Sequence, residues 1–263
     1  MNRLATCLIA ALSALLFAVP AVFAQSEIHI SPAEAASIGK EIWRNECAGT
    51  RDGLTSWNTG ENFASLGIGH FIWYPAGRRG PFKESFPALR DSLRSQGVEL
   101  PAWLLEAQAC PWSDRAAFMA DFHGPRLTGL RSLLAATVEQ QARFAALRLE
   151  SSLPDMLSAV PVGARAAIRA NFYRVANAPG GLYALMDYVN FKGEGTSPTE
   201  RYNREGWGLL QVLEEMSGAG AALSTFAKSA DRVLTRRVEL SPPARGEKRW
   251  LPGWRNRVAT YAP

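Results

Sequence analysis

Residues 46–74 read ECAGTRDGLTSWNTGENFASLGIGHFIWY, and they place a single acid, Glu46, ahead of two short strand patterns. The first pattern runs from Leu54 to Trp57 and the second from Phe63 to Ile68, with the turn residues NTGEN between them. Strand-forming residues on both sides of such a turn predict a β-hairpin. The stretch is therefore expected to form a small antiparallel sheet directly after Glu46.

The segment before Glu46 predicts an amphipathic helix. It begins with the capping box S-P-A-E at residues 31–34, whose proline takes the first helical position, where a missing N–H costs nothing. Apolar residues then recur with helical spacing at Ala35, Ile38 and Ile42, and Glu46 is the next position on that stripe. The side chain of Glu46 is thus expected to face the interior.

Burial and the negative end of a helix dipole both favour the protonated form of a carboxyl group, and that form suits a general acid near neutral pH. A lone glutamate at a helix end is more often a solvated surface residue. The position of Glu46 alone leaves both interpretations open.

The segment Ser65 to His70, S-L-G-I-G-H, resembles the motif that closes the small β lobe of phage-type lysozymes. In that family a helix ending in the catalytic glutamate comes shortly before the motif. The resemblance implies an α+β, mostly α-helical, lysozyme-like fold with a small β-hairpin lobe and a helical body. It makes Glu46 the general acid, Ser65 the hydroxyl residue that helps to place the attacking water, and His70 the motif histidine beside the substrate.

The chain departs from the family pattern in its turn. The family has a second acid, an aspartate, shortly after the aromatic residue of the first strand, where this chain has Asn58 and Thr59. Glu61 is the only carboxylate in the turn and becomes the substitute catalytic candidate, although it also fits a solvated turn residue. Asn58 is expected to contact the substrate.

A second resemblance lies at residues 206–211, G-W-G-L-L-Q, which are similar to the Gly-Leu-Met-Gln element of lytic transglycosylases. Glu194 stands upstream of it at about the distance of the catalytic glutamate in those enzymes. The resemblance makes Glu194 a rival acid or a residue on the far wall of the same cleft, with Trp207 and Gln211 near the sugar. The same apolar spacing also fits a plain core helix.

The C-terminal segment 249–257, R-W-L-P-G-W-R-N-R, loosely resembles the closing Gly-Leu-x-x-Arg-Arg stretch of phage-type lysozymes, with Trp254 in place of leucine. Aromatic rings can stack on sugars, so Trp73 is expected, like Trp207, to line the cleft. Tryptophans of this kind are more often simply core.

The middle of the chain predicts helices separated by Pro and Gly. Their expected ranges are 85–96, 101–108, 113–122, 125–149, 163–175, 181–191, 206–216 and 219–234.

The N-terminus reads as a cleavable signal peptide, residues 1–24, with Arg3, an apolar run from Leu8 to Val19 and a small-residue end. One catalytic domain, residues 25–263, is expected to follow, in the periplasm or outside the cell and without stable membrane insertion. Export leaves Cys47 and Cys110 as an even pair in an oxidising compartment. They form either one disulfide or two buried free thiols.

The formal net charge is +5, which suits an anionic polymer. The densest basic clusters, Arg236–Arg237 and Arg245–Arg249, are interpreted as solvated helix ends and a loop, and no nucleic-acid motif appears. Neither Cys47 nor Cys110 has the company needed for a metal site or a cysteine nucleophile, because His29, His70 and His123 are scattered.

We therefore expect a monomeric, secreted or periplasmic enzyme that cleaves β-1,4 linkages of peptidoglycan with Glu46 as general acid and needs no cofactor. One alternative is a lytic transglycosylase that uses Glu46 or Glu194, because one acid suffices there. The other is a wall-binding protein that kept the fold without catalysis, which the Asn58-Thr59 substitution favours.

Overall fold

A computed structural model of the protein describes residues 27–80 and 82–262. The expected signal peptide, residues 1–24, lies outside the described residues. Within them, no helix is long and apolar enough to cross a membrane.

The described chain is mostly helical, with small antiparallel sheets, which confirms the predicted α+β class. The helices are α1 (Pro32–Cys47), α2 (Phe86–Ser95), α3 (Ala102–Glu106), α4 (Arg115–Ala120), α5 (Pro125–Ala136), α6 (Val138–Ser158), α7 (Val162–Ala176), α8 (Gly181–Lys192), α9 (Leu209–Glu215), α10 (Ala222–Leu240) and α11 (Leu251–Ala259). The strands are β1 (Thr55–Ser56), β2 (Ala64–Leu66), β3 (Phe71–Trp73), β4 (Arg201–Tyr202) and β5 (Glu205–Gly206), and short 3-10 turns are η1 (Asp52–Leu54), η2 (Pro243–Arg245) and η3 (Glu247–Arg249).

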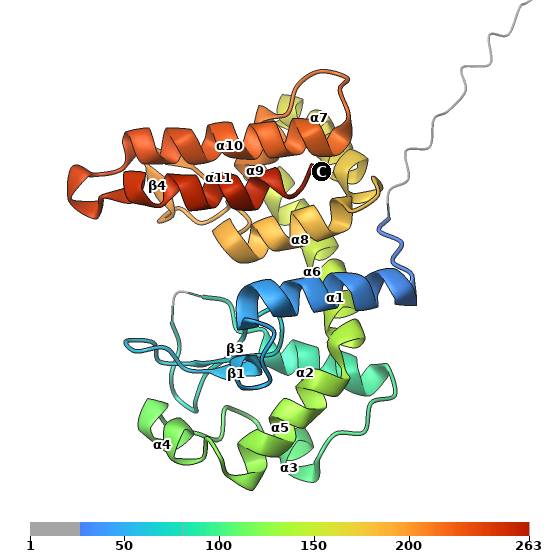
Figure 1. Ribbon diagram of the computed structural model, residues 1–263, viewed down its shortest axis with the longest axis vertical. Helices are drawn as coiled ribbons and strands as arrows, with labels where there is room; N and C mark the ends of the chain where they lie inside the picture. The colour runs from blue at the N-terminus through green and yellow to red at the C-terminus, as the bar shows by residue number, and fades with distance from the viewer. Residues whose placement is uncertain (1–26, 81, 263) are drawn as a thin grey trace, which may run out of the picture.

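These elements gather at two ends of the molecule (Figure 1). The three-stranded sheet lies with α2 to α5 at one end, and α7 to α11 form the other end. Helices α1 and α6 lie between the two groups and pack against each other. The position of α1 means that its C-terminal residues meet both ends of the fold.

The predicted N-terminal helix is confirmed as α1. The Ser31 hydroxyl accepts a hydrogen bond from the Glu34 N–H at 3.2 Å, and Pro32 takes the first position. The helix ends where Ala48 turns left-handed, with φ 51°, and its N–H bonds back to the Trp43 carbonyl. Glu46 therefore sits in the last turn.

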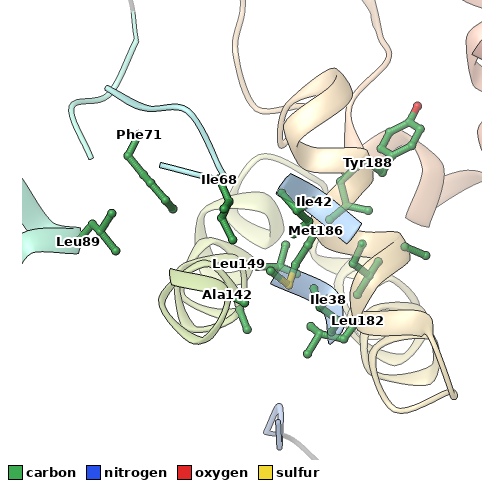
Figure 2. Close-up of a cluster of buried hydrophobic side chains, with 14 of the residues drawn as sticks. Ile38, Ile42, Ile68, Phe71, Leu89, Ala142, Leu149, Leu182, Met186 and Tyr188 are labelled. Carbon is green, nitrogen blue, oxygen red and sulfur yellow. The ribbon is translucent and has the colours of Figure 1, made fainter. Parts of the chain in front are cut away.

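One apolar cluster joins the two ends of the fold (Figure 2). Ile38 and Ile42 of α1 lie between Ile68 of the sheet segment and Met186 of α8, with Leu149 of α6 beside them. All five are buried. The apolar stripe that the sequence predicted on α1 thus packs against both the sheet end and the helical end of the fold.

The predicted hairpin is confirmed and is extended by a third strand. The strand order is β1-β2-β3, all antiparallel, with Thr55 opposite Leu66 and Ser65 opposite Ile72. The Gly67–His70 turn joins β2 to β3, and both end residues of this turn have positive φ, 73° and 48°. The motif glycine at 67 therefore holds a backbone conformation that other side chains rarely adopt.

The single helix predicted over 125–149 is wrong, because the chain breaks at Thr137 into α5 and α6. At the break the Leu134 carbonyl accepts the Thr137 N–H, and the Gln141 side-chain amide also donates to it. The Gln141 Oε1 atom in turn accepts the Ile68 N–H at 3.0 Å. A fully buried glutamine thus fixes the Gly67–His70 turn to the start of α6.

The other predicted helices are confirmed with shifted ends. The largest shifts are at α9, which begins at Leu209 because Gly206 belongs to β5, and at α10, which continues to Leu240. The residues that α10 adds after position 234 are mostly polar, so the apolar spacing did not predict that the helix continues there.

Gly67→Ala should cost about 2 to 4 kcal/mol of unfolding free energy, because the new methyl adds left-handed strain and would overlap the Gln141 Oε1 atom. Gly77→Ala is the matched control, since Gly77 has φ 72° but no neighbour within 4 Å of the added carbon. Urea unfolding of both variants measures the difference. Equal losses would show that the Gln141 contact does not constrain this turn.

Candidate functional site

Glu46 lies where three elements meet, and its side chain is turned inward with 16% of its surface exposed. Its Oε1 atom accepts a hydrogen bond from Arg257 Nη2 of α11 at 2.5 Å. Its Oε2 atom lies 3.9 Å from Nδ1 of His70, in the turn between β2 and β3. Residues from the helix, the sheet and the C-terminus therefore converge on one carboxyl group.

Arg257 is held by a second acid, Asp187 of α8. Two of its nitrogens donate to the two Asp187 oxygens at 2.8 Å, and the Tyr261 hydroxyl donates to the same carboxylate at 2.6 Å. The Asp187 side chain is only 1% exposed, so three donors compensate its burial.

The pKa values of Tyr261 and Arg257 are both raised, and their contacts with Asp187 contribute to both shifts. Burial, and then the charge of Asp187, raise the pKa of the Tyr261 hydroxyl. Burial alone would lower the pKa of the Arg257 guanidinium, but its bonds to Asp187 and Glu46 outweigh burial and raise it. Arg257 is thus a fixed cation between two acids.

Cys47 lies on the other side of His70 from Glu46, so that the histidine ring stands between a thiol and a carboxyl group. Its sulfur lies 3.9 Å from His70 Nε2 and 3.8 Å from the Gly67 carbonyl oxygen. The histidines are scattered in the sequence, and the fold brings one of them, His70, beside Cys47. Burial, with a smaller effect of Glu46, raises the pKa of the Cys47 thiol to about 12, so the thiol is not a nucleophile near neutral pH.

Of the two alternatives for Cys47 and Cys110, a disulfide or two buried free thiols, the structure shows the free thiols. Cys47 packs against the turn before β3, whereas the Cys110 N–H bonds to the Tyr74 carbonyl after β3. The extended strand between these points spans roughly 13 Å, well beyond the reach of a disulfide.

The remaining hairpin candidates lie along β2 and the turn before it. Ser65 is buried in the middle of β2, on the face it shares with its partners Ser56 and Ile72. Asn58 is exposed in the turn, and Glu61 is half-buried in the same turn. This turn precedes β2 and His70 follows it, so Glu61 lies at the other end of the strand from the Glu46 contacts.

Both tryptophans expected to line a cleft are buried, which corrects that prediction. Trp73 is completely buried against Phe86, with ring centroids 4.7 Å apart. The Trp207 ring lies 4.7 Å from the Tyr202 ring and 4.0 Å from the Arg237 guanidinium, which cover it. Their faces are used in packing and are closed to a sugar.

Gln211 likewise has a structural role. Its Oε1 accepts the Gly208 N–H at 3.0 Å and its Nε2 donates to the Gly195 carbonyl at 3.2 Å, so its amide holds the loop before α9. Glu194 lies in that loop, two residues after α8, and is half-buried. The structure records no hydrogen bond or ion pair between Glu194 and the Glu46 group among the described residues.

Asp187 and Tyr261 are site residues that the sequence did not reveal, and Arg257 was noted only within the closing segment. Asp187 had a signal: it is the one charged residue in GLYALMDYVNF, an otherwise apolar helix. A carboxylate on such a stripe requires a buried cation as a partner.

Two cavities, of about 460 and 720 Å³, lie around the segment that leads into α1 and the neighbouring part of α6. Both are lined by Ile28 and Leu147, and neither is lined by Glu46, His70 or Arg257. The expected sugar-sized groove beside Glu46 is not one of these two cavities.

Comparison of the chain with protein-family models, with curated proteins and with solved structures found no match.

Arg257→Met should lower the free energy of unfolding by about 3 to 5 kcal/mol, because it leaves buried Asp187 without its cation. Arg255→Met is the matched control on the same helix, where the exposed Arg255 and Asp231 pair contributes at most about 1 kcal/mol. Urea denaturation followed by circular dichroism compares the two. A loss for Arg257→Met no larger than the control would contradict the network.

Proposed function

We propose that the protein is an exported, monomeric glycan-cleaving enzyme that acts on β-1,4 linkages of peptidoglycan, with Glu46 as the general acid. The observation that carries the proposal is the convergence on Glu46. Its two side-chain partners, His70 and Arg257, come from the two segments that resemble phage-type lysozymes, although 187 positions separate them in the chain. A lysozyme-like fold accounts for this meeting.

In the proposed step, Glu46 transfers its proton to the glycosidic oxygen, the bond to the anomeric carbon breaks, and positive charge develops on the sugar. Arg257 donates to Glu46 in the structure, so this contact must open before Glu46 can donate a proton. Asp187 keeps two hydrogen bonds to the same guanidinium and can hold Arg257 in place when Glu46 turns to the substrate.

The second half of the reaction needs a nucleophile for the anomeric carbon. In a hydrolase this is water, and Ser65 is the residue proposed to help place it. Ser65 is itself buried, but it lies on the less buried face of the sheet, which it shares with half-buried Ser56 and Ile72.

Lytic transglycosylation is the second candidate, and one observation favours it. Glu61 lies at the other end of β2, and Asp187 is occupied by Arg257 and Tyr261, so neither supplies a free second carboxylate beside Glu46. A transglycosylase needs only one acid, because the 6-hydroxyl of the sugar attacks the anomeric carbon. A wall-binding protein without activity is the third candidate.

Glu46→Gln should abolish the release of fragments from purified sacculi, because the amide keeps the shape of the side chain but cannot donate the proton. Glu194→Gln tests the rival acid, and Glu41→Gln is the control, since Glu41 is an exposed acid on the same helix that pairs with Arg44. Chromatography of the released fragments with mass spectrometry measures the activity, and the end group separates hydrolysis, which leaves a reducing sugar, from transglycosylation, which leaves an anhydro-sugar.

Loss of activity in Glu194→Gln but not in Glu46→Gln would reverse the assignment. Full activity in both variants would exclude both acids. Binding to sacculi without any fragments from the parent protein would support the wall-binding alternative.

A further inference from the structure

Helix α11 and Trp250, the residue before it, carry a row of side chains that leads from the surface to Glu46. Trp250, Trp254 and Arg257 follow one another at helical spacing. Trp250 is 41% exposed at one end of the row, and Arg257 bonds Glu46 at the other end. The two tryptophan rings are 6.1 Å apart, and Phe191 of α8 continues the row 6.4 Å from Trp254. The Arg257 guanidinium lies 4.5 Å from the Phe191 ring.

Lys192, the last residue of α8, points its ammonium into this row. The Nζ atom lies 3.6 Å from the centre of the Trp254 ring and 3.9 Å from that of Phe191. Among the described residues it has no hydrogen-bond acceptor and no carboxylate within ion-pair distance. Cation–π contacts therefore replace the acceptors that a half-buried ammonium normally requires.

The acids near Lys192 are already bonded to other residues. Glu247 of η3 is buried and accepts from Arg237 of α10 at 2.8 and 3.0 Å and from the Tyr202 hydroxyl at 2.8 Å. Arg237 is 12% exposed, so the prediction of a solvated Arg236–Arg237 pair is wrong at Arg237. Arg257 of α11, the other cation facing Lys192, is bonded to its own acids.

This environment leaves Lys192 with an unmatched positive charge. The pKa of Lys192 is lowered to about 7, mainly by burial and also by the charges of Arg237 and Arg257, while Glu247 opposes them. The ammonium is therefore destabilised in the free protein and would be stabilised by an anion that reaches it.

We propose that Lys192, Trp250 and Trp254 form a subsite for a sugar that carries a carboxylate. This inference rests on the proposed function and names the part of the substrate that the protein selects. Trp250 is 41% exposed, with the Arg249 guanidinium 4.8 Å from the centre of its ring, and its exposed surface suits stacking on a sugar. The ammonium at Lys192 supplies the charge for the acid group of that sugar. Arg257 links the row to Glu46, which orients the bound glycan toward the acid.

The carboxylate can belong to the sugar itself, as in the lactyl ether of N-acetylmuramic acid, or to the peptide attached there. Three probes distinguish these sources in calorimetric titrations: the disaccharide of N-acetylglucosamine and N-acetylmuramic acid, the same disaccharide with its tetrapeptide, and chitobiose, which has no carboxylate. Both acidic probes carry a negative charge. Only the first has a free lactyl carboxylate, because the tetrapeptide of the second is attached through that group.

The lactyl disaccharide, the peptide disaccharide or both should bind the parent protein at least about tenfold more tightly than chitobiose, as a charged hydrogen bond implies. Lys192→Met should remove this preference, so that the variant binds the acidic probes no more tightly than chitobiose, and Trp250→Ala should weaken the binding of all three probes. Lys228→Met, at an exposed lysine of α10, is the control and should change neither.

The preference should also fall as pH rises from 6 to 9. Lys192 loses its proton near pH 7 in the free protein, and a neutral amine does not attract a carboxylate. Lys192→Met should abolish this slope. The variant should also unfold at a higher temperature than the parent below pH 7, and the gain should shrink toward pH 10, because the parent then no longer folds around a charged lysine.

Equal affinity for acidic probes and chitobiose in the parent, or a preference that survives Lys192→Met, would overturn the subsite. These binding results are independent of cleavage. A Lys192-dependent preference without fragments from sacculi would retain the subsite and reject the enzyme, whereas cleavage without the preference would retain the enzyme and reject the subsite.

Discussion

The contact on which the site depends is the bond between Arg257 and the buried carboxylate of Asp187. A carboxylate that is 1% exposed is costly unless a cation and hydrogen bonds compensate it, and Arg257 and Tyr261 provide both from the end of the chain. Because Arg257 also bonds Glu46, the same guanidinium ties α1, α8 and α11 together. The position of the candidate acid is thus a consequence of how Asp187 is neutralised.

A second constraint sets the other side of the site. Gln141 is completely buried, and its side-chain amide donates to the carbonyl of Leu134 and accepts the N–H of Ile68. This fixes the turn that carries His70 to the break between α5 and α6. Ile38 and Ile42 of α1 pack beside that turn, so the sheet and the helix that bears Glu46 share one core (Figure 2).

The two constraints give the proposed enzyme a specific chemical character. One acid stands between an arginine and a histidine, the neighbouring thiol is buried with its pKa raised to about 12, and the nearest other carboxylate is occupied. Proton donation by Glu46, as we propose it, therefore requires the Arg257 contact to open, while Asp187 keeps its own bonds to the guanidinium. The row of Trp250, Trp254 and Lys192 on the adjoining helices adds selectivity for an acidic sugar to this chemistry.

The sequence alone determined the local features: the capped helix α1, its buried stripe ending at Glu46, the hairpin and most helices. Capping, periodicity and turn residues act within a few positions, so a single sequence displays them. It did not show the break at Thr137, where a buried glutamine bonds both the end of α5 and a turn that is distant in the sequence. The resemblance to transglycosylases suggested Gln211 as a site residue, and the ability of aromatic rings to stack on sugars suggested Trp73 and Trp207. In the structure both rings are buried in packing, and the Gln211 amide bonds the loop before α9.

Only the tertiary structure decided which residues surround Glu46. Arg257 lies 211 positions from it and Asp187 lies 70 positions from Arg257, and no local pattern relates them. Their meeting follows from the requirement that a buried charge find its counter-charge, a requirement that the chain satisfies only when α1, α8 and α11 pack together.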